Sequence, residues 1–356
     1  MIGRWKHQWM GKRPAWLVGW LTLKNRLRDC LPGRSRQKVL YAFNDFQTTS
    51  PTYDIVTFLL LAESRRLELG CDSMTVVFIP GHRDGFRVTD GKEQNEMGNE
   101  NLRWRLRQIV VPCCSLMPSC TAMLHFDDRK TARRQLGIPR YRYPEAYDYA
   151  FPLKSNYWVD VERRHQSTGT TPSIEATPVA VNYVRQWMQR NGFKKVVTMS
   201  LRDASYMAGR NSNRDEWLKM ARYLEQAGTT PVILPDNEVA FDPGDELRPY
   251  FLFNEALWNV ELRAALYQES YMNLFVSGGP VALSMCNWRS RSLIFKISNE
   301  EFVVTSKKHI RESMGLESGE SPCVCGLFQQ YVWKEDTFEN IRTAYDQMVE
   351  KIEAAG

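Results

Sequence analysis

The stretch KVVTMSLRDASYMAGRNSN, residues 195–213, indicates the fold of this chain. Its first six residues form an apolar, β-branched run that is typical of a buried strand. The remainder is polar, and a helical pattern follows from Arg214 to Gln226 before Gly228 ends it. In open α/β sheets, ligands bind beyond the carboxyl ends of the strands. The stretch therefore predicts an α/β domain with a binding loop directly after a strand.

The same alternation of apolar runs and helical patterns extends to both sides. In the second half we expect strands at 230–234, 273–276 and 292–296, the last of them ending the sheet, and helices at 179–191, 254–269, 281–286 and 337–354. In the first half we expect strands at 38–43 and 74–79, helices at 54–69 and 101–111, and a helix turn and a strand within 112–126. Strands that alternate with helices are typical of parallel sheets with crossover connections.

Two such halves predict two Rossmann-like domains that face each other across a cleft. The expected boundaries are an N-terminal arm at 1–37, a first domain at 38–165, a second domain at 179–335 and a C-terminal helix at 336–356. Residues 166–178 are rich in Ser, Thr, Gly and Pro and read as the loop between the halves. The order within 129–164 is not readable from its pattern.

Composition excludes two classes of protein. The chain of 356 residues is 43% hydrophobic and 12% aromatic, which is too apolar for a disordered protein and long enough for two domains. Residues 1–38 hold ten Lys or Arg and only one acid, Asp29, whereas the rest holds 37 basic and 40 acidic side chains. Because the body is slightly acidic, nucleic acid is not an expected partner.

The N-terminal arm interleaves tryptophan with basic residues. Trp5 and Trp9 lie four residues apart, as do Trp16 and Trp20, and Pro14 divides the segment into two short helices. Tryptophan favours the headgroup region of a bilayer and cations favour anionic lipids. We expect residues 1–36 to bind an anionic membrane surface. A helix packed on the protein body remains an alternative, as does single-stranded nucleic acid bound by stacking.

Cysteine spacing and hydropathy suggest a cytoplasmic protein. The eight cysteines offer no two CxxC couples for a structural zinc site, so we expect free thiols and no metal. No stretch reaches the roughly 20 apolar residues that cross a bilayer. The apolar run 15–23 is followed by Lys24, Arg26 and Arg28 with no small-residue cleavage site, which disfavours secretion. The expected location is the cytoplasm, with peripheral attachment to the inner face of the membrane.

The loop after residue 200 carries the densest set of polar side chains. Arg202 and Arg210 could both reach phosphate oxygens, and residues 211–213 could donate hydrogen bonds and cap the following helix. The structural alternative is a capped loop in which Arg202 pairs with a carboxylate such as Asp203. The predicted phosphate-binding residues of the loop are Arg202, Asp203, Tyr206, Arg210, Asn211 and Ser212.

A further set of residues follows an expected strand end in the second half. Ser277, Gly278, Gly279 and Pro280 form a turn that opens a helix, where backbone N–H groups can approach an anion. A tight corner without a ligand would have the same sequence.

In the first half, candidate general bases also follow expected strand ends. They are Asp45 and His82, whereas Asp54 is more simply an acid of a first helical turn. An exposed loop histidine without a catalytic role is the alternative for His82.

These residues resemble a known family. The pattern Ser200-Leu-Arg-Asp-Ala-Ser-Tyr206, then Gly-Arg-Asn-Ser-Asn, resembles the H-x-R-D-S-x-Y…R-N-S-x loop of bacterial glycosyltransferase-like proteins linked to surface polysaccharide. More distantly it resembles the phosphate-binding loop of fucosyltransferase-type GT-B enzymes. Residues 263–267, 273–280, 294–296 and 50–63 are similar to the same group, so the resemblance covers roughly 38–300. The chain departs from it at Ser200, where relatives often have His.

The resemblance implies a GT-B fold and a metal-independent glycosyltransferase without a cofactor. It implies a nucleotide-sugar donor held by the second domain, with Arg202 neutralising the departing diphosphate. The first domain would bind the acceptor, a cell-surface polysaccharide or a lipid-linked glycan, and the enzyme would be a hexosyl- or deoxyhexosyl-transferase. The alternatives are a nucleotide-sugar epimerase of the same architecture and a non-catalytic nucleotide- or sugar-binding protein.

Overall fold

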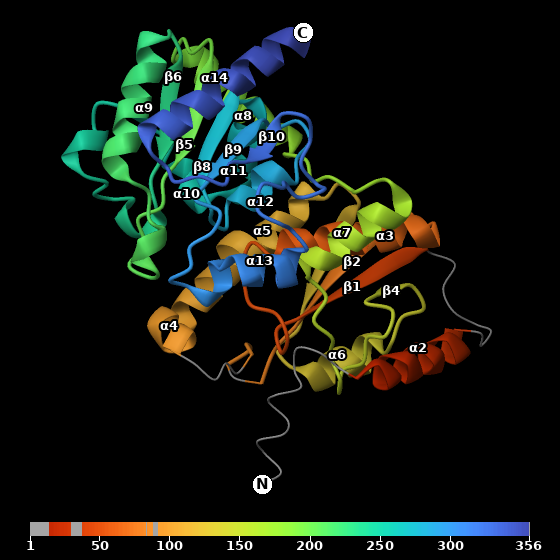
Figure 1. The fold of residues 1–356 in the computed structure, drawn as a ribbon. Helices are drawn as coiled ribbons and strands as arrows, with labels where there is room; N and C mark the ends of the chain where they lie inside the picture. Colours follow the sequence, from red (N-terminus) through yellow and green to blue (C-terminus); the bar gives the residue numbers. More distant parts are fainter. Residues whose placement is uncertain (1–13, 30–37, 83, 88–91, 356) are drawn as a thin grey trace. The chain divides into compact units, whose positions relative to one another are not determined.

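The computed structural model describes residues 14–29, 38–82, 84–87 and 92–355. The chain divides into two compact units, Met1–Asp160 and Val161–Gly356 (Figure 1). Helix α7 (Trp158–Thr168) crosses the boundary between them. Trp5 and Trp9 of the N-terminal arm lie outside the described residues. Among the described residues, no helix is both long and apolar enough to span a bilayer.

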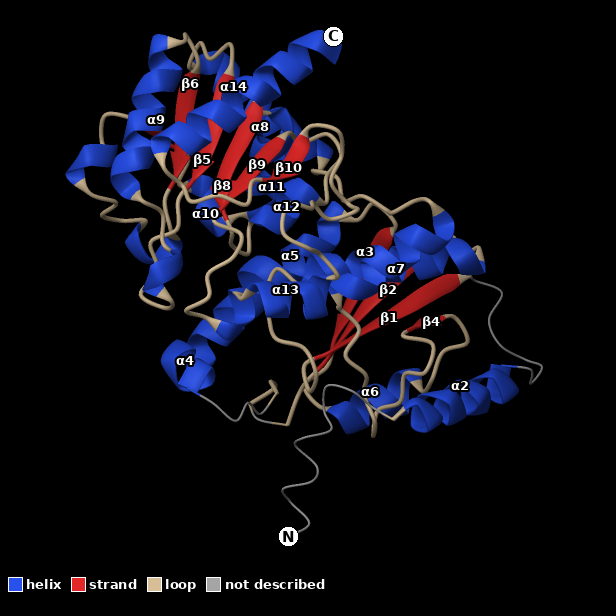
Figure 2. Cartoon of the chain, viewed as in Figure 1, coloured by secondary structure: helices blue, strands red, loops and turns tan. Residues whose placement is uncertain are grey.

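The first unit is built on a four-stranded parallel sheet with the order β3-β2-β1-β4. In Figure 2, α3 lies over one face of this sheet, and α2 and α6 lie over the other. Its strands are β1 (Val39–Asp45), β2 (Ser73–Ile79), β3 (Cys120–His125) and β4 (Arg142–Tyr143). Its helices are α2 (Ala15–Asp29), α3 (Ile55–Leu69), α4 (Lys92–Arg105), α5 (Val111–Cys113) and α6 (Arg129–Leu136), with the π-helix Leu106–Val110 and the 3-10 turn Cys114–Leu116 around α5.

The expected elements of the first unit are confirmed, with changed ends. Strand β1 continues past residue 43 to Asp45, because Asn44 and Asp45 stay in register with β2 and are buried. Helix α3 ends where predicted, at Gly70, whose φ of 60° is the left-handed conformation that glycine adopts without strain. The helix expected at 101–111 changes into a π-helix at Leu106. The segment 129–164, which shows no readable pattern, contains α6, β4 and the start of α7.

The second unit is built on a six-stranded parallel sheet with the order β10-β9-β8-β5-β6-β7. Its strands are β5 (Val196–Ser200), β6 (Thr230–Leu234), β7 (Phe251–Leu252), β8 (Met272–Val276), β9 (Ser292–Phe295) and β10 (Gln329–Tyr331). Its helices are α8 (Pro178–Arg190), α9 (Arg214–Gln226), α10 (Glu255–Trp258), α11 (Val260–Glu269), α12 (Val281–Met285), α13 (Lys307–Met314) and α14 (Phe338–Ala355), and short 3-10 turns lie at 208–210, 237–239, 245–247 and 303–305.

The strand order of the second unit is that of a doubly wound dinucleotide-binding domain. Counted from β5 along the chain, the six strands lie in the spatial order 3-2-1-4-5-6. The chain leaves β5 toward β6 and β7 and then returns to β8 on the other side. Connections after β5 and β8 therefore diverge, and the point where the order reverses lies between these two strands.

Two features of the second unit correct the sequence-based expectation. The strand at 292–296 is not the last strand, because β10 adds a further three residues at the sheet edge beside β9. The helix expected at 254–269 is interrupted at Asn259, whose backbone is extended and whose side chain accepts a hydrogen bond from the N–H of Leu262 as the N-cap of α11.

The two faces of the second sheet are buried in different ways. On one face, Val197, Met199 and Leu274 belong to an apolar core together with Trp217 of α9 and Tyr345 of α14. The alternating side chains face the other way, because successive residues of a strand point to opposite faces. There a buried polar side chain, Asn273, holds the strands and loops together.

We expect Asn273 to stabilise this second face of the sheet. Its Nδ2 donates to the carbonyl oxygens of Tyr267 (2.8 Å) and Arg291 (2.9 Å) and to Ser290 Oγ (3.0 Å), and its Oδ1 accepts from Thr198 Oγ1 at 2.6 Å. Asn273→Leu leaves these partners buried without a hydrogen bond and should lower the free energy of unfolding by about 2 to 3 kcal/mol. Thr198→Val leaves one acceptor unpaired and should cost about 1 kcal/mol. Urea unfolding measures both changes in the free energy of unfolding. An Asn273→Leu variant as stable as the unchanged protein would contradict the stabilising role of Asn273.

Candidate functional site

The two segments singled out from the sequence follow the two strands between which the strand order reverses. The loop 201–213 follows β5, and the turn 277–280 follows β8, which pairs with β5 in parallel. Ligands of open α/β sheets bind at such a reversal, outside the carboxyl ends of the strands. The fold of the second unit thus brings together two features that lie more than sixty residues apart in the chain.

The loop after β5 is closed on itself by reciprocal hydrogen bonds. The N–H of Arg202 donates to Ser212 Oγ at 2.9 Å, and the N–H of Ser212 donates to the carbonyl of Arg202 at 2.9 Å. The side-chain amide of Asn211 accepts from the N–H of Ala204 (3.2 Å) and donates to its carbonyl (3.0 Å). Asn211 and Ser212 therefore fix the shape of the loop.

The guanidinium of Arg202 is used inside this loop. It donates to the carbonyl oxygens of Tyr206 and Met207 and to Asn211 Oδ1. Burial lowers the pKa of Arg202, and the charges of Asp236 and Glu238 act in the opposite direction. Met207 adopts a left-handed φ of 54°, which is strained for a residue with a side chain. The ion pair with Asp203 considered from the sequence does not form, because Asp203 pairs with Arg214 at 2.6 Å.

Arg210 links the loop after β5 to the turn after β8. Its Nη2 donates to the carbonyl oxygen of Ser277 at 3.2 Å, and its Nη1 lies 3.7 Å from Met207 Sδ. Burial lowers the pKa of Arg210, and so does the nearby positive charge of Arg202. Within the part of the chain that the structure describes, Arg210 forms no salt bridge. A half-buried cation beside a second cation is an arrangement that an anionic ligand would relieve.

Lys296 brings a third cation to the same edge of the sheet. It directly follows β9, and its Nζ donates to the carbonyl oxygen of Asn211 at 2.8 Å and lies 3.7 Å from Asp336 Oδ1. Asp336 is buried and also accepts hydrogen bonds from the N–H of Asn213 and from Trp217 Nε1. Sequence reasoning did not select Lys296 as a site residue, although its position after a strand was a usable signal.

The turn after β8 does not need glycine at position 278 for its own packing. The N–H of Ser277 donates to the carbonyl of Phe295 at 2.9 Å, which ties the turn to β9. A Cβ added to Gly278 would meet no atom closer than 3.8 Å, so the protein's own packing does not require glycine there. Pro280 precedes α12, which has only five residues.

Asp203 and Asn213 make contacts other than those expected from the sequence. The Asp203 carboxylate forms an ion pair with Arg214, and the backbone N–H of Asp203 donates to Asp236 Oδ2 at 3.3 Å. Asn213 stands at the N-cap of α9, but its side chain makes no capping hydrogen bond. Instead its N–H is bound by Asp336. Asn213 therefore holds the predicted N-cap position, but without a capping hydrogen bond from its side chain.

Asp45 lies at the corresponding strand end of the first unit, where it is fully engaged. It is 1% exposed and accepts hydrogen bonds from Arg129 Nη1 (2.8 Å), Arg129 Nη2 (2.9 Å), Tyr147 Oη (2.9 Å) and the N–H of Gln47 (2.9 Å). Burial raises the pKa of Tyr147 well above its usual value, and the charge of Asp45 adds to this effect. This geometry favours a structural role for Asp45.

His82 occupies an exposed turn after β2. The turn closes where the N–H of Gly81 donates to the carbonyl of Gly85 at 2.8 Å. Gly81 is required there, because a Cβ would lie 2.3 Å from backbone atoms of Phe86. The fold thus presents His82 at the same sheet edge as Asp45 with its side chain exposed. Among the described residues, no group of three or more His, Cys, Asp or Glu side chains could hold a metal ion.

Comparison with known proteins supports the architecture. No protein-family model and no curated protein sequence matches the chain. The structure is similar to ADP-heptose LPS heptosyltransferase II of E. coli, with 10% identity and a TM-score of 0.50 over 89% of this chain and 100% of that chain. It is also similar to a glycosyl transferase family 9 structure from Veillonella parvula DSM 2008, with 11% identity and a TM-score of 0.44 over 88% and 97%. At this identity the likeness shows the fold alone, and it confirms the predicted GT-B type with two Rossmann-like domains.

Proposed function

We propose that this protein is a glycosyltransferase that binds the diphosphate of a nucleotide sugar between the loop after β5 and the turn after β8. The observation that carries the proposal is Arg210, a half-buried cation without a salt bridge among the described residues, which bridges both segments at the reversal of strand order. The likeness in fold to a heptosyltransferase supports the same reading.

The cations Arg210 and Lys296 at this edge of the sheet suit a departing nucleoside diphosphate. Transfer of a sugar breaks its bond to the diphosphate, and negative charge accumulates on the leaving oxygen. Arg210 and Lys296 can stabilise this charge with charge-assisted hydrogen bonds, as a metal ion does in other enzymes. We therefore propose metal-independent transfer. Arg202 would act by holding the loop in shape, with its positive charge as a second, longer-range contribution.

For the acceptor we propose a cell-surface polysaccharide or a lipid-linked glycan, modified by a hexosyl or deoxyhexosyl group in the bacterial cytoplasm. The E. coli neighbour is named for ADP-heptose and LPS, which agrees with a glycan acceptor. We also propose that the protein works at the inner face of the membrane through its N-terminal arm, residues 1–36. Of the two candidate bases, we favour His82, because its side chain is exposed, whereas the carboxylate of Asp45 already accepts hydrogen bonds from Arg129 and Tyr147.

Release of nucleoside diphosphate tests the reaction. The protein is incubated with ADP-, UDP-, GDP- and CDP-linked sugars, with and without a membrane-glycan extract as acceptor. We expect release from one donor class that the acceptor increases. Epimer formation without acceptor would instead identify an epimerase, and binding without turnover would identify a non-catalytic protein.

Gly278→Ala separates ligand space from folding. Because the added methyl group has no close neighbour, we expect no loss of stability and about tenfold weaker donor binding as the methyl group meets the diphosphate. Gly326→Ala is the matched control, with its nearest atom 3.6 Å from the added Cβ. Calorimetric titration and thermal unfolding measure the two effects. Equal donor affinity in both variants would place the diphosphate away from Gly278.

A further inference from the structure

Helix α2 presents a continuous apolar row on its exposed side. Trp16, Trp20, Leu23 and Leu27 are between 53% and 72% exposed. Their spacing of four, three and four residues places all of them on one side of the helix. With a rise of 1.5 Å per residue the row extends over roughly 16 Å. A row of large apolar side chains in water is typical of a surface that binds a partner or a membrane.

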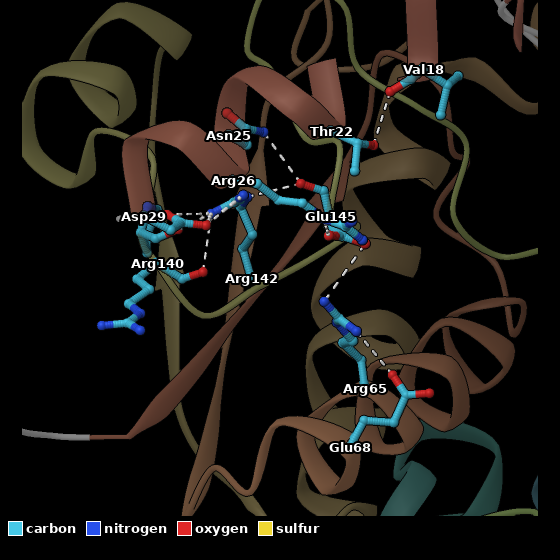
Figure 3. Close-up of polar contacts among 11 residues, drawn as sticks. Val18, Thr22, Asn25, Arg26, Asp29, Arg65, Glu68, Arg140, Arg142 and Glu145 are labelled. Carbon is cyan, nitrogen blue, oxygen red and sulfur yellow. Dashed lines mark hydrogen bonds and ion pairs between the residues drawn. The ribbon is translucent and has the colours of Figure 1, made fainter. Parts of the chain in front are cut away.

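The other side of α2 is docked on the first unit. Leu21 and Asn25 are buried, and they lie opposite the exposed row on the helix. Asn25 Nδ2 donates to the carbonyl oxygens of Glu145 and Tyr147, both at 3.2 Å. Figure 3 shows the Asn25 side chain pointing toward Glu145. A buried amide without a hydrogen-bond partner lowers the stability of the fold. These hydrogen bonds therefore fix the rotation of the helix about its axis.

Ion pairs hold the C-terminal half of α2 in place. The guanidinium of Arg142 is buried and donates to Asp29 at 3.0 and 3.1 Å (Figure 3). Arg26 Nε donates to Glu145 Oε1 at 2.8 Å, and Lys24 Nζ lies 3.4 Å from Asp148 Oδ2. The helix is therefore a fixed part of the first unit, and the apolar row is held outward by it.

Basic side chains border the row. Lys24 and Arg26 lie on its two flanks, each paired with an acid of the first unit, and Arg28 follows, so the helix itself carries three cations and one acid, Asp29. Lys24 Nζ also lies 5.1 Å from the centre of the Trp20 ring. An apolar face with tryptophan and leucine between basic flanks is the pattern of helices that lie in the interface of an anionic bilayer.

We propose that the outer face of α2 is a rigid docking surface for an anionic phospholipid bilayer, with Trp16, Trp20, Leu23 and Leu27 inserted below the headgroups. The surface moves as one body with the first unit, so membrane binding orients that unit rather than tethering it. The inference rests on the membrane location proposed above and is independent of the sugar-transfer reaction.

Flotation of the full-length protein with vesicles tests the surface. The vesicles contain phosphatidylcholine alone or phosphatidylcholine with 30% phosphatidylglycerol, a fraction on the order of that in anionic membranes. We expect binding to the anionic vesicles only. Trp16→Ser with Trp20→Ser should reduce the partition coefficient about tenfold or more.

Trp288→Ser is the matched control, since Trp288 is 56% exposed on the second unit against 53% for Trp20. Its binding should equal that of the unchanged protein. Flotation of the double variant at the unchanged level would overturn the proposal, as would a tryptophan-dependent dimer seen by sedimentation without lipid. Nucleotide titration of the double variant keeps the tests apart, because donor affinity should not change in it.

Hydrogen exchange tests the rigid attachment. Without vesicles, the amides of residues 18–29 should exchange slowly, because the helix is docked. Exchange at the rate of an unstructured chain, with flotation intact, would show a flexible tether and overturn the proposal of a rigid surface.

Discussion

Asp45→Asn is expected to lower the free energy of unfolding by about 3 to 5 kcal/mol. The carboxylate is almost completely buried and accepts four hydrogen bonds, two of them from the guanidinium of Arg129. The neutral amide turns one acceptor oxygen into a donor that opposes Arg129 or Tyr147. It also leaves the charge of Arg129 uncompensated, and only 16% of that side chain is exposed. Urea unfolding followed by circular dichroism measures the loss.

Asp245→Asn provides the matched control, because the pair of Asp245 with Arg248 lies in water, with side chains 86% and 69% exposed. Exposed pairs contribute about 0 to 1 kcal/mol, so this variant should unfold almost as the unchanged protein does. The double variant Asp45→Asn, Arg129→Gln should recover part of the lost stability, because no buried charge remains unpaired. Full stability of Asp45→Asn together with lost turnover would contradict the structural role and favour Asp45 as the general base.

Arg210→Gln is expected to weaken the binding of the nucleoside diphosphate by about 10- to 150-fold, which corresponds to 1.5 to 3 kcal/mol for a hydrogen bond to a charged group. Glutamine keeps an uncharged amide but is two bonds shorter than arginine, so both the charge and the contact with the carbonyl of Ser277 are lost. Calorimetric titration gives the affinity, and thermal unfolding shows that the fold is intact.

The comparison with other arginines sharpens this result. Arg248→Gln removes an exposed charge of the same unit and should leave the affinity unchanged. Arg202→Gln should reduce both affinity and the order of the loop, because Arg202 holds the carbonyl oxygens of Tyr206 and Met207. Equal affinity of Arg210→Gln and the unchanged protein would remove Arg210 from the diphosphate site.

Long apolar runs made most of the fold predictable. Strands β1, β2, β5, β6 and β8 are largely buried, so their sequences are mostly apolar, and helices α3 and α9 end at or next to a glycine, Gly70 and Gly228. Strands β4, β7 and β10 were missed because two or three residues at a sheet edge leave no period to detect. Helix α13 was also missed.

The chemistry was less predictable than the fold. The loop after β5 and the turn after β8 were found because both follow strands, but only the strand order makes them neighbours. Asp45 was selected because acids after strands are often functional. Its partner Arg129 lies 84 residues away in the chain, and no local pattern reveals such a pair. Lys296 also follows a strand, which was a usable signal, but its contact with Asn211, which places it beside the loop, spans 85 residues.

A structure of the protein with bound nucleoside diphosphate tests the central claim most directly. We predict that the diphosphate lies between the loop after β5 and the turn after β8, within hydrogen-bonding distance of Arg210 and beside Gly278. A diphosphate bound elsewhere in the molecule, with Arg210 still donating only to Ser277, would contradict the account.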